Sequence, residues 1–285
     1  MEIFEQNSIV AFIDILGFKD IVLANSQSKD NVIFKELINA IEQSYKKAFS
    51  FGIDGLSAIG DHFEENLTSK FKYKVFSDNL FISYDYEEDL SDYGFAVYWI
   101  TAMSVIYQRE MLNKKFYVRG GIADGQNYSN DHVIFSDALI KAYELETKIA
   151  KYPRIVVEDS IVRKQDECFN EHIFKSELKK VFVKDWTGTL FVNPFKLFES
   201  FGELIPKVPE AMPIINKMRE DTKVLKLEPD VTDYILAQTV TNDLNIKLKQ
   251  YGKVPELYEK YLWLYEFINW NDEHPNNLIF EYLYK

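Results

Sequence analysis

Two aspartates, Asp14 and Asp78, lie within or between apolar segments, where a charged side chain is unexpected unless it has a chemical role. Asp14 interrupts the apolar run IVAFIDILGF, which reads as a buried strand that ends at Gly17. A buried carboxylate is costly unless it is paired or binds a metal, although it could also cap the helix that begins at Phe18. Asp78 stands in Ser77-Asp78-Asn79, between two short alternating apolar runs, and could be only a turn residue.

The two aspartates would meet if the first strand lies beside the hairpin that carries Asp78. Two adjacent carboxylates repel each other, and divalent cations relieve that repulsion. Such a pair is what two-metal phosphoryl chemistry needs, and Mg²⁺ typically uses one or two carboxylates together with water and substrate phosphates. Gly17 and Phe18 then lead into a helix whose first N–H groups would face a triphosphate.

The elements that must position these residues follow from periodicity and turn residues. We expect strands over residues 9–15, 115–125 and 154–159, and hairpins over 71–86 and 181–195. We expect helices over residues 18–25, 30–51, 90–114 and 136–151, an irregular stretch over 52–70, and an almost entirely helical region from 197 to 285. This order predicts an α+β fold, a mixed sheet with helices packed on one face as in ferredoxin-like folds.

Composition limits the partners. The 285 residues carry a net charge of -12, which argues against binding to nucleic acid or to an anionic membrane but leaves a metal-bound nucleotide open. The single cysteine, Cys168, excludes an intrachain disulfide framework and fits a reducing compartment. No apolar run approaches the ~20 residues of a membrane span. We therefore expect a cytoplasmic protein.

Four motifs in order carry a family resemblance. FIDILGF resembles the metal-binding opening strand of class III nucleotidyl cyclases, and KVFSDNLFISY resembles their hairpin with the second metal-binding aspartate. YVRGGIADG is similar to the next strand, and FSDALIKAYELE to the helix that ends in Leu-Glu. Together with the segment YPRIVVED and the helical C-terminal region, these motifs most resemble the sequences of the pyrimidine cyclases of bacterial Pycsar antiphage systems.

The sequence departs from the family pattern at several positions. Ser77 replaces the usual glycine before the second aspartate. Ile140 and Glu144 stand where purine cyclases carry an asparagine and an arginine that orient the ribose and stabilise the transition state. Lys74 matches the base-reading lysine of adenylate cyclases, but Val133 stands in place of its acidic or polar partner. A half-retained purine pocket favours a smaller base.

The missing positive charge could come from any of three residues, Arg119, Lys141 or Lys184, and the sequence does not choose among them. The resemblance implies two Mg²⁺ or Mn²⁺ ions per site, held by Asp14, Asp78 and the carbonyl of Ile15. It also implies a homodimer with sites across the interface, so that Lys74 and Asp14 of one site come from different subunits.

The resulting hypothesis is a uridylate cyclase that makes cyclic UMP and pyrophosphate from UTP for a separate effector in antiphage defence. Residues 1–196 would form the catalytic domain, and 197–285 a helical extension packed on it. Three alternatives stay open: a cytidylate cyclase, an adenylate cyclase with an unusual pocket, and an inactive cyclase-like domain that binds a nucleotide.

Overall fold

The computed structural model describes residues 6–25, 32–57, 69–87, 90–130, 132–168, 181–196, 233–274 and 279–280. The strands are β1 (Gln6–Ile15), β2 (Phe71–Phe76), β3 (Asn79–Tyr86), β4 (Val118–Ser129), β5 (Ile134–Ser136), β6 (Ile155–Val157), β7 (Phe182–Asp185), β8 (Leu190–Val192) and β9 (Ile279–Phe280). The helices are α1 (Phe18–Asn25), α2 (Val32–Ser57), α4 (Leu90–Asn113), α5 (Asp137–Glu144), the π-helical turn η1 (Leu145–Ile149), α6 (Asp159–Cys168), α10 (Asp233–Gln250) and α11 (Pro255–Glu273).

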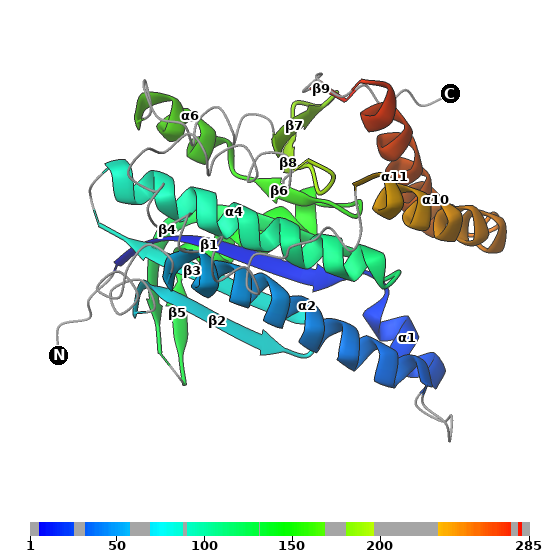
Figure 1. Cartoon of the computed structure of the whole chain (residues 1–285), viewed down its shortest axis with the longest axis horizontal. Coiled ribbons are helices and arrows are strands. Elements are labelled where there is room, and N and C mark those ends of the chain that lie inside the picture. The colour runs from blue at the N-terminus through cyan, green and yellow to red at the C-terminus, as the bar shows by residue number, and fades with distance from the viewer. Residues whose placement is uncertain are drawn as a thin grey trace, which may run out of the picture.

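The strands form one mixed sheet in the order β2-β3-β1-β4-β6-β8-β7-β9, with β5 beside β4 (Figure 1). β1 lies antiparallel between β3 and β4, whereas β4 and β6 run parallel. The first four strands and the helices between them therefore have the ferredoxin-like arrangement. The expected α+β fold, a mixed sheet with helices, is confirmed.

The two faces of β1 bury different helices, because successive side chains of a strand point to opposite sides. Ile13 belongs to the core beneath α2 and α4, which lie over one face of the sheet (Figure 1). Val10 and Phe12 point to the other face, where they pack against Ala138 and Ala142 of α5. The expectation that helices cover only one face was therefore wrong for α5.

α5 lies unusually close to β4, and a glycine allows it. A Cβ atom on Gly121 would lie 2.2 Å from the carbonyl oxygen of Ala142, so no larger residue fits without a shift of the helix. The single helix expected over 136–151 is instead α5 followed by η1, in which the Ala150 N–H donates to the Leu145 carbonyl at 2.7 Å. π-helical turns of this kind occur frequently at functional sites.

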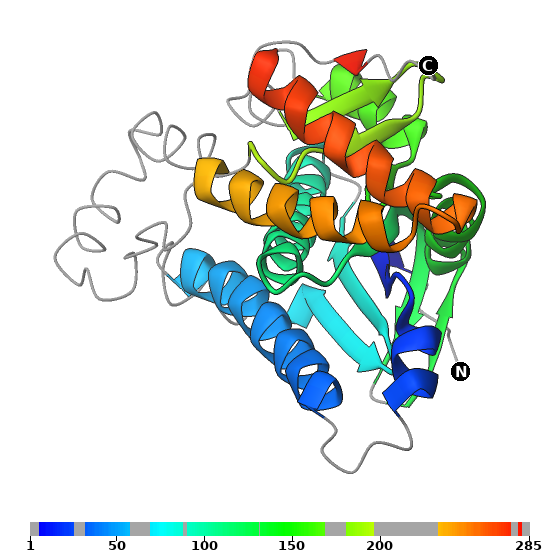
Figure 2. The ribbon, with the colours of Figure 1, turned by 90° about the vertical axis from the view of Figure 1, so that its right-hand side faces the viewer.

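The C-terminal helices α10 and α11 lie side by side and pack against the β7–β8 end of the sheet (Figure 2). A buried ion pair lies at this contact: Arg154 donates to Asp185 at 2.5 Å. The Arg154 guanidinium also lies 5.3 Å from the ring centres of Tyr152 and Trp263 and 5.4 Å from that of Phe191. Aromatic contacts and a paired charge thus join α11 to the sheet.

Some boundaries differ from the sequence expectation. α2 continues through Ser57, so residues 52–57 are helical rather than irregular. β5 and β9, of 3 and 2 residues, were not expected, and β9 lies in the region expected to be almost entirely helical. Residues 58–68 of the expected irregular stretch and residues 197–232 lie outside the described residues, whereas residues 69 and 70 are helical. No helix in the described ranges is long and apolar enough to cross a membrane.

Candidate active site

The register of β1 and β3 brings the two predicted aspartates together. Asp14, near the end of β1, pairs with Asn79, the first residue of β3, and Asp78 directly precedes that residue. Ser77, which begins the turn, has a φ of 58°, in the left-handed region that glycine adopts most easily. The side chains of Asp14 and Asp78 are in hydrogen-bond contact, as the two-carboxylate interpretation requires.

Arg119 reaches the same site from β4, where it pairs with Asp14 across the antiparallel register. Its Nε and Nη2 atoms each lie 3.4 Å from Asp14 Oδ2. Its shortest contact is with another carboxylate, because Nε lies 2.6 Å from Oε1 of Glu146 in η1. Of the three cations considered from the sequence, Arg119 is the one whose described contacts place it against Asp14.

Glu146 is the residue that sequence reasoning missed. It ends the Leu-Glu motif, which the sequence comparison used to align the helix without giving Glu146 a role. Its side chain is 2% exposed, and Arg119 Nε lies within ion-pair distance. Glu146 continues the spacing of the buried Ala138 and Ala142, so a charged residue on the apolar face of this helical segment was the available signal.

The electrostatics of the cluster favour added positive charge. Burial, the contact with Asp78 and the charges of Glu146 and Asp78 raise the pKa of Asp14 from 3.8 to about 7, against the lowering effect of Arg119. Burial likewise raises the pKa of Glu146, again opposed by Arg119. The guanidinium of Arg119 thus contacts two of the three carboxyl groups, Asp14 and Glu146, and the excess of negative charge favours the binding of a cation.

The donor set fits a hard divalent cation. Two carboxylates in contact, followed in β1 by the carbonyl of Ile15, are oxygen ligands of the kind and number that Mg²⁺ uses before water and phosphate complete its coordination. Across the described ranges, no group of three or more His, Cys, Asp and Glu side chains is arranged to hold a metal. A site here would thus depend on substrate oxygens for the rest of its ligands.

The segment after Asp14 turns sharply into a short helix. Gly17 has a φ of 77°, and its carbonyl accepts from Ile21 within α1, which begins at Phe18. The first N–H groups of this helix therefore follow Asp14 by only a few residues in the sequence. Leu16 packs into the same core cluster as α10 and α11, so the C-terminal helices support this turn.

Lys74 and Val133 come together, but not at the carboxylate pair. The Lys74 ammonium donates to the carbonyl of Asn130, whose side chain accepts from the Val133 N–H at 2.8 Å. Asn130 follows the last residue of β4, whereas Arg119 lies at the start of that strand. The proposed base-reading pair therefore meets at the turn after β4, away from Arg119, although the backbone of Lys74 is level with Gly121 in the register of the sheet.

The other candidate residues also lie away from the carboxylates. Lys141 donates to the carbonyl of Asp124 at 2.8 Å, five residues along β4 from Arg119. Lys184 is exposed on β7, where it pairs with Leu190 and Ile279. Ile140 and Glu144, the departures from the family pattern, are both exposed on α5. None of these contacts supplies positive charge to Asp14.

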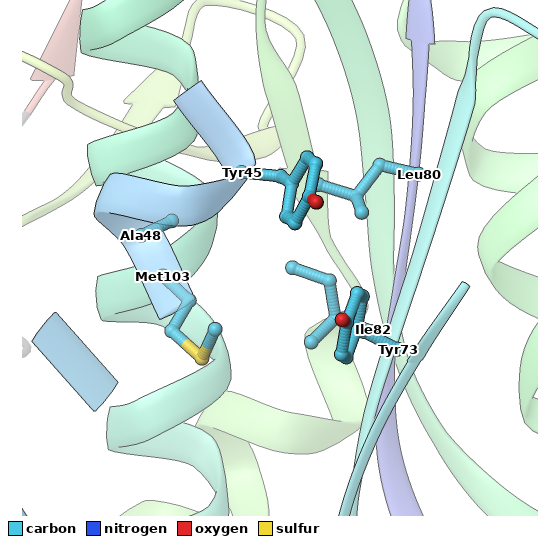
Figure 3. A pocket seen from close by; sticks show the side chains of 6 residues that line it. All are labelled: Tyr45, Ala48, Tyr73, Leu80, Ile82 and Met103. Atoms are coloured by element: carbon cyan, nitrogen blue, oxygen red, sulfur yellow. The ribbon is translucent and has the colours of Figure 1, made fainter. Parts of the chain in front are cut away.

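An apolar pocket lies on the other side of the sheet, between α2, α4 and the β2–β3 hairpin (Figure 3). Its lining residues are Tyr45, Ala48, Tyr73, Leu80, Ile82 and Met103. The rings of Tyr45 and Tyr73 stack with 5.8 Å between their centres. The lining offers no cation or carboxylate for a phosphate or a metal, so we place the candidate site at Asp14 and not here.

Comparisons with known proteins give weak structural similarities. No protein-family model and no curated protein matches the sequence. The monomeric guanylyl cyclase domain of the RhoGC fusion protein from the aquatic fungus Blastocladiella emersonii aligns with 15% identity and a TM-score of 0.39, covering 66% of this chain and 95% of that one. A class III adenylyl cyclase-like ATP-binding protein from Pseudomonas aeruginosa has 10% identity and a TM-score of 0.39, covering 70% and 43%. The guanylyl cyclase Cya2 has 10% identity and a TM-score of 0.33, covering 58% and 81%. At these values the activity has to be inferred from the residues of the chain itself.

Proposed function

We propose that this chain is a class III nucleotidyl cyclase that converts UTP to 3′,5′-cyclic UMP and pyrophosphate. The observation that carries the proposal is the contact between Asp14 and Asp78, where burial and mutual repulsion raise the pKa of Asp14 to about 7. Ionising both carboxyl groups in this place is unfavourable in the absence of a cation. Divalent cations would remove the repulsion, so we interpret the pair as a metal-binding site. The four sequence motifs, in order, point to the same chemistry.

Each residue of the cluster has a role in the proposed reaction. Asp14, Asp78 and the Ile15 carbonyl would hold Mg²⁺ or Mn²⁺, which would supply charge to neutralise the triphosphate and to lower the pKa of the ribose 3′-hydroxyl. The N–H groups at Gly17 and Phe18 would bind phosphate oxygens. Arg119 would stabilise the negative charge that develops as the 3′-oxygen attacks the α-phosphorus and pyrophosphate leaves.

The direct test compares Asp14→Asn and Asp78→Asn with the parent, each incubated with Mn²⁺ and the four ribonucleoside triphosphates. We expect product formation to fall by about a hundredfold or more in both variants, because an amide is a poor metal ligand. Glu144→Gln serves as the control, since Glu144 is exposed and pairs only with Lys148 in the described contacts. Turnover by both aspartate variants within a few-fold of the parent would exclude the two-metal assignment.

We also propose that the active form is a homodimer. A second copy could bring its Lys74 and Val133 to the carboxylate pair of the first, and twofold symmetry would then create two equivalent sites. Exposed apolar side chains near β5 and α5 offer a surface for that contact: Phe76, Val133, Phe135, Ile140 and Tyr143. Sedimentation should give a dimer, and Phe135→Glu should weaken it together with activity. A monomer that is fully active at nanomolar concentration would contradict this proposal.

The preferred base follows from Lys74 and Val133. The Lys74 ammonium can exchange the Asn130 carbonyl for O2 or O4 of uracil, whereas Val133 provides no acceptor for the amino group of cytosine or adenine. An unmet donor costs about 1–3 kcal/mol, which corresponds to a preference for UTP over CTP of about ten- to a hundredfold. Equal mixtures of UTP, CTP, ATP and GTP, with the cyclic products identified by mass spectrometry, test this order.

The same mixtures separate the alternatives. Cyclic CMP as the main product would identify a cytidylate cyclase, and cyclic AMP would identify an adenylate cyclase and overturn the pocket reasoning. Nucleotide binding without any product would identify an inactive domain. By its resemblance to Pycsar cyclases, we assign residues 1–196 the catalytic role and expect a separate effector to bind the product.

A further inference from the structure

We propose that Glu146 is a positioning residue that controls how strongly the Asp14–Asp78 pair binds a divalent cation, acting through Arg119. This inference rests on the metal-binding part of the proposed function. Glu146 does not itself complete a three-carboxylate metal group in the described structure. Its influence would come from holding a cation, the Arg119 guanidinium, that otherwise competes for Asp14.

The distances show how the guanidinium is shared. Arg119 Nε lies 2.6 Å from Glu146 Oε1 but 3.4 Å from Asp14 Oδ2. The Asp14 contact is a hydrogen bond at the long end of the range, whereas the Glu146 contact is a close ion pair without hydrogen-bond geometry, since Glu146 Oε1 accepts no hydrogen bond from the described residues. Arg119 is therefore held beside Asp14 without fully occupying the carboxylate.

The fold fixes Glu146 in this position. η1 begins directly before it and lies against β4 because Gly121 leaves room for Ala142 and Leu145. The side chain is only 2% exposed, so it cannot relax into solvent when its partner changes. Glu144, two residues earlier, is exposed and pairs with Lys148 at 2.5 Å. It offers a control on the same helix.

This arrangement predicts opposite effects for the two partners. Without the charge of Glu146, the site loses a negative charge and Arg119 is free to pair fully with Asp14, so cation binding should weaken. Without Arg119, three carboxyl groups remain with no guanidinium between them, so cation binding should strengthen. A side chain with a purely structural role would lower affinity in both cases.

The experiment measures Mn²⁺ binding without nucleotide, by the electron paramagnetic resonance signal of free Mn²⁺, on the full chain. We expect Glu146→Gln to weaken binding by about tenfold or more, the range found for residues that support metal ligands. Arg119→Gln should tighten it by about threefold or more, and the double variant should return close to the parent. Glu144→Gln should leave the affinity for Mn²⁺ unchanged. Glu146→Asp, which keeps the negative charge, should lower this affinity less than Glu146→Gln does.

The outcomes separate this inference from the proposed function. Far-ultraviolet circular dichroism first shows whether each variant is folded. If Glu146→Gln does not fold, the inference is decided by whether Arg119→Gln strengthens or weakens Mn²⁺ binding. Weaker Mn²⁺ binding in Arg119→Gln, or no change in a folded Glu146→Gln, would overturn the inference. A parent that binds no Mn²⁺ would overturn it together with the metal site. The expected pattern without any cyclic product would support the inference and refute the cyclase activity.

Discussion

Replacing Asp14 by asparagine should stabilise the metal-free protein while it removes the proposed cyclase activity. In the folded chain, burial, the contact with Asp78 and the charges of Glu146 and Asp78 raise the pKa of Asp14 to about 7, from 3.8 in an ordinary environment. A carboxyl group with a raised pKa favours the folded state most below pH 3.8, where it is protonated in both states. That advantage is lost as the pH rises through about 7, because the folded state must then ionise Asp14 unfavourably. Asparagine cannot ionise and avoids this loss.

The magnitude follows from the two pKa values. Each pH unit between 3.8 and about 7 removes up to about 1.4 kcal/mol, which gives an upper limit of about 4 kcal/mol at pH 8. The Asp14 side chain is 17% exposed, and water and the nearby guanidinium screen the site. We therefore expect Asp14→Asn to exceed the parent by roughly 2 kcal/mol in unfolding free energy at pH 8, with a gap that narrows steadily toward pH 5.

Urea denaturation at pH 5, 6, 7 and 8, in the presence of a chelator, measures this gap. Glu144→Gln, which removes an exposed carboxylate of the same region, should stay within about 0.5 kcal/mol of the parent at every pH. Saturating Mn²⁺ should raise the stability of the parent but not that of Asp14→Asn, since only the parent retains both carboxylates. An Asp14→Asn variant that is less stable than the parent at pH 8, or a gap that does not change with pH, would refute the reasoning.

Three further predictions concern Ser77, Gly121 and the buried ion pair of Asp185, each measured by urea denaturation. Ser77→Gly should change stability by less than about 1 kcal/mol, because relief of the left-handed backbone is offset by the freedom of glycine in the unfolded chain; Ser77→Val should lower it by about 1–2 kcal/mol. Gly121→Ala should cost about 2 kcal/mol or more and reduce Mn²⁺ binding, since its Cβ would meet the Ala142 carbonyl and displace η1. Burial alone would raise the pKa of Asp185, but the hydrogen bonds from Arg154 and Thr187 lower it, so Asp185→Asn should cost about 3 kcal/mol at pH 7 and less below pH 4.

The sequence by itself determined the elements that carry the carboxylate pair. Strands are indicated by the residue pattern of 9–15 and by the apolar runs on either side of Ser77-Asp78-Asn79. These signals are local, because a strand and a tight turn can each be recognised from a few consecutive residues. Once the first strand and the hairpin are neighbours, Asp14 and Asp78 can only meet at the turn. That part of the site was therefore predictable, and the structure brings the two side chains into contact.

Only the tertiary structure decided which groups surround that pair. Glu146 reaches Arg119 because α5 packs closely on the second face of the sheet, where Gly121 leaves room for it, and continues into a π-helical turn. Lys74 bonds to Asn130 because the β4–β5 hairpin lies within its reach, and β5 itself is too short to leave a periodic signal. These contacts join residues far apart in the chain, and side-chain packing rather than local periodicity sets their distances.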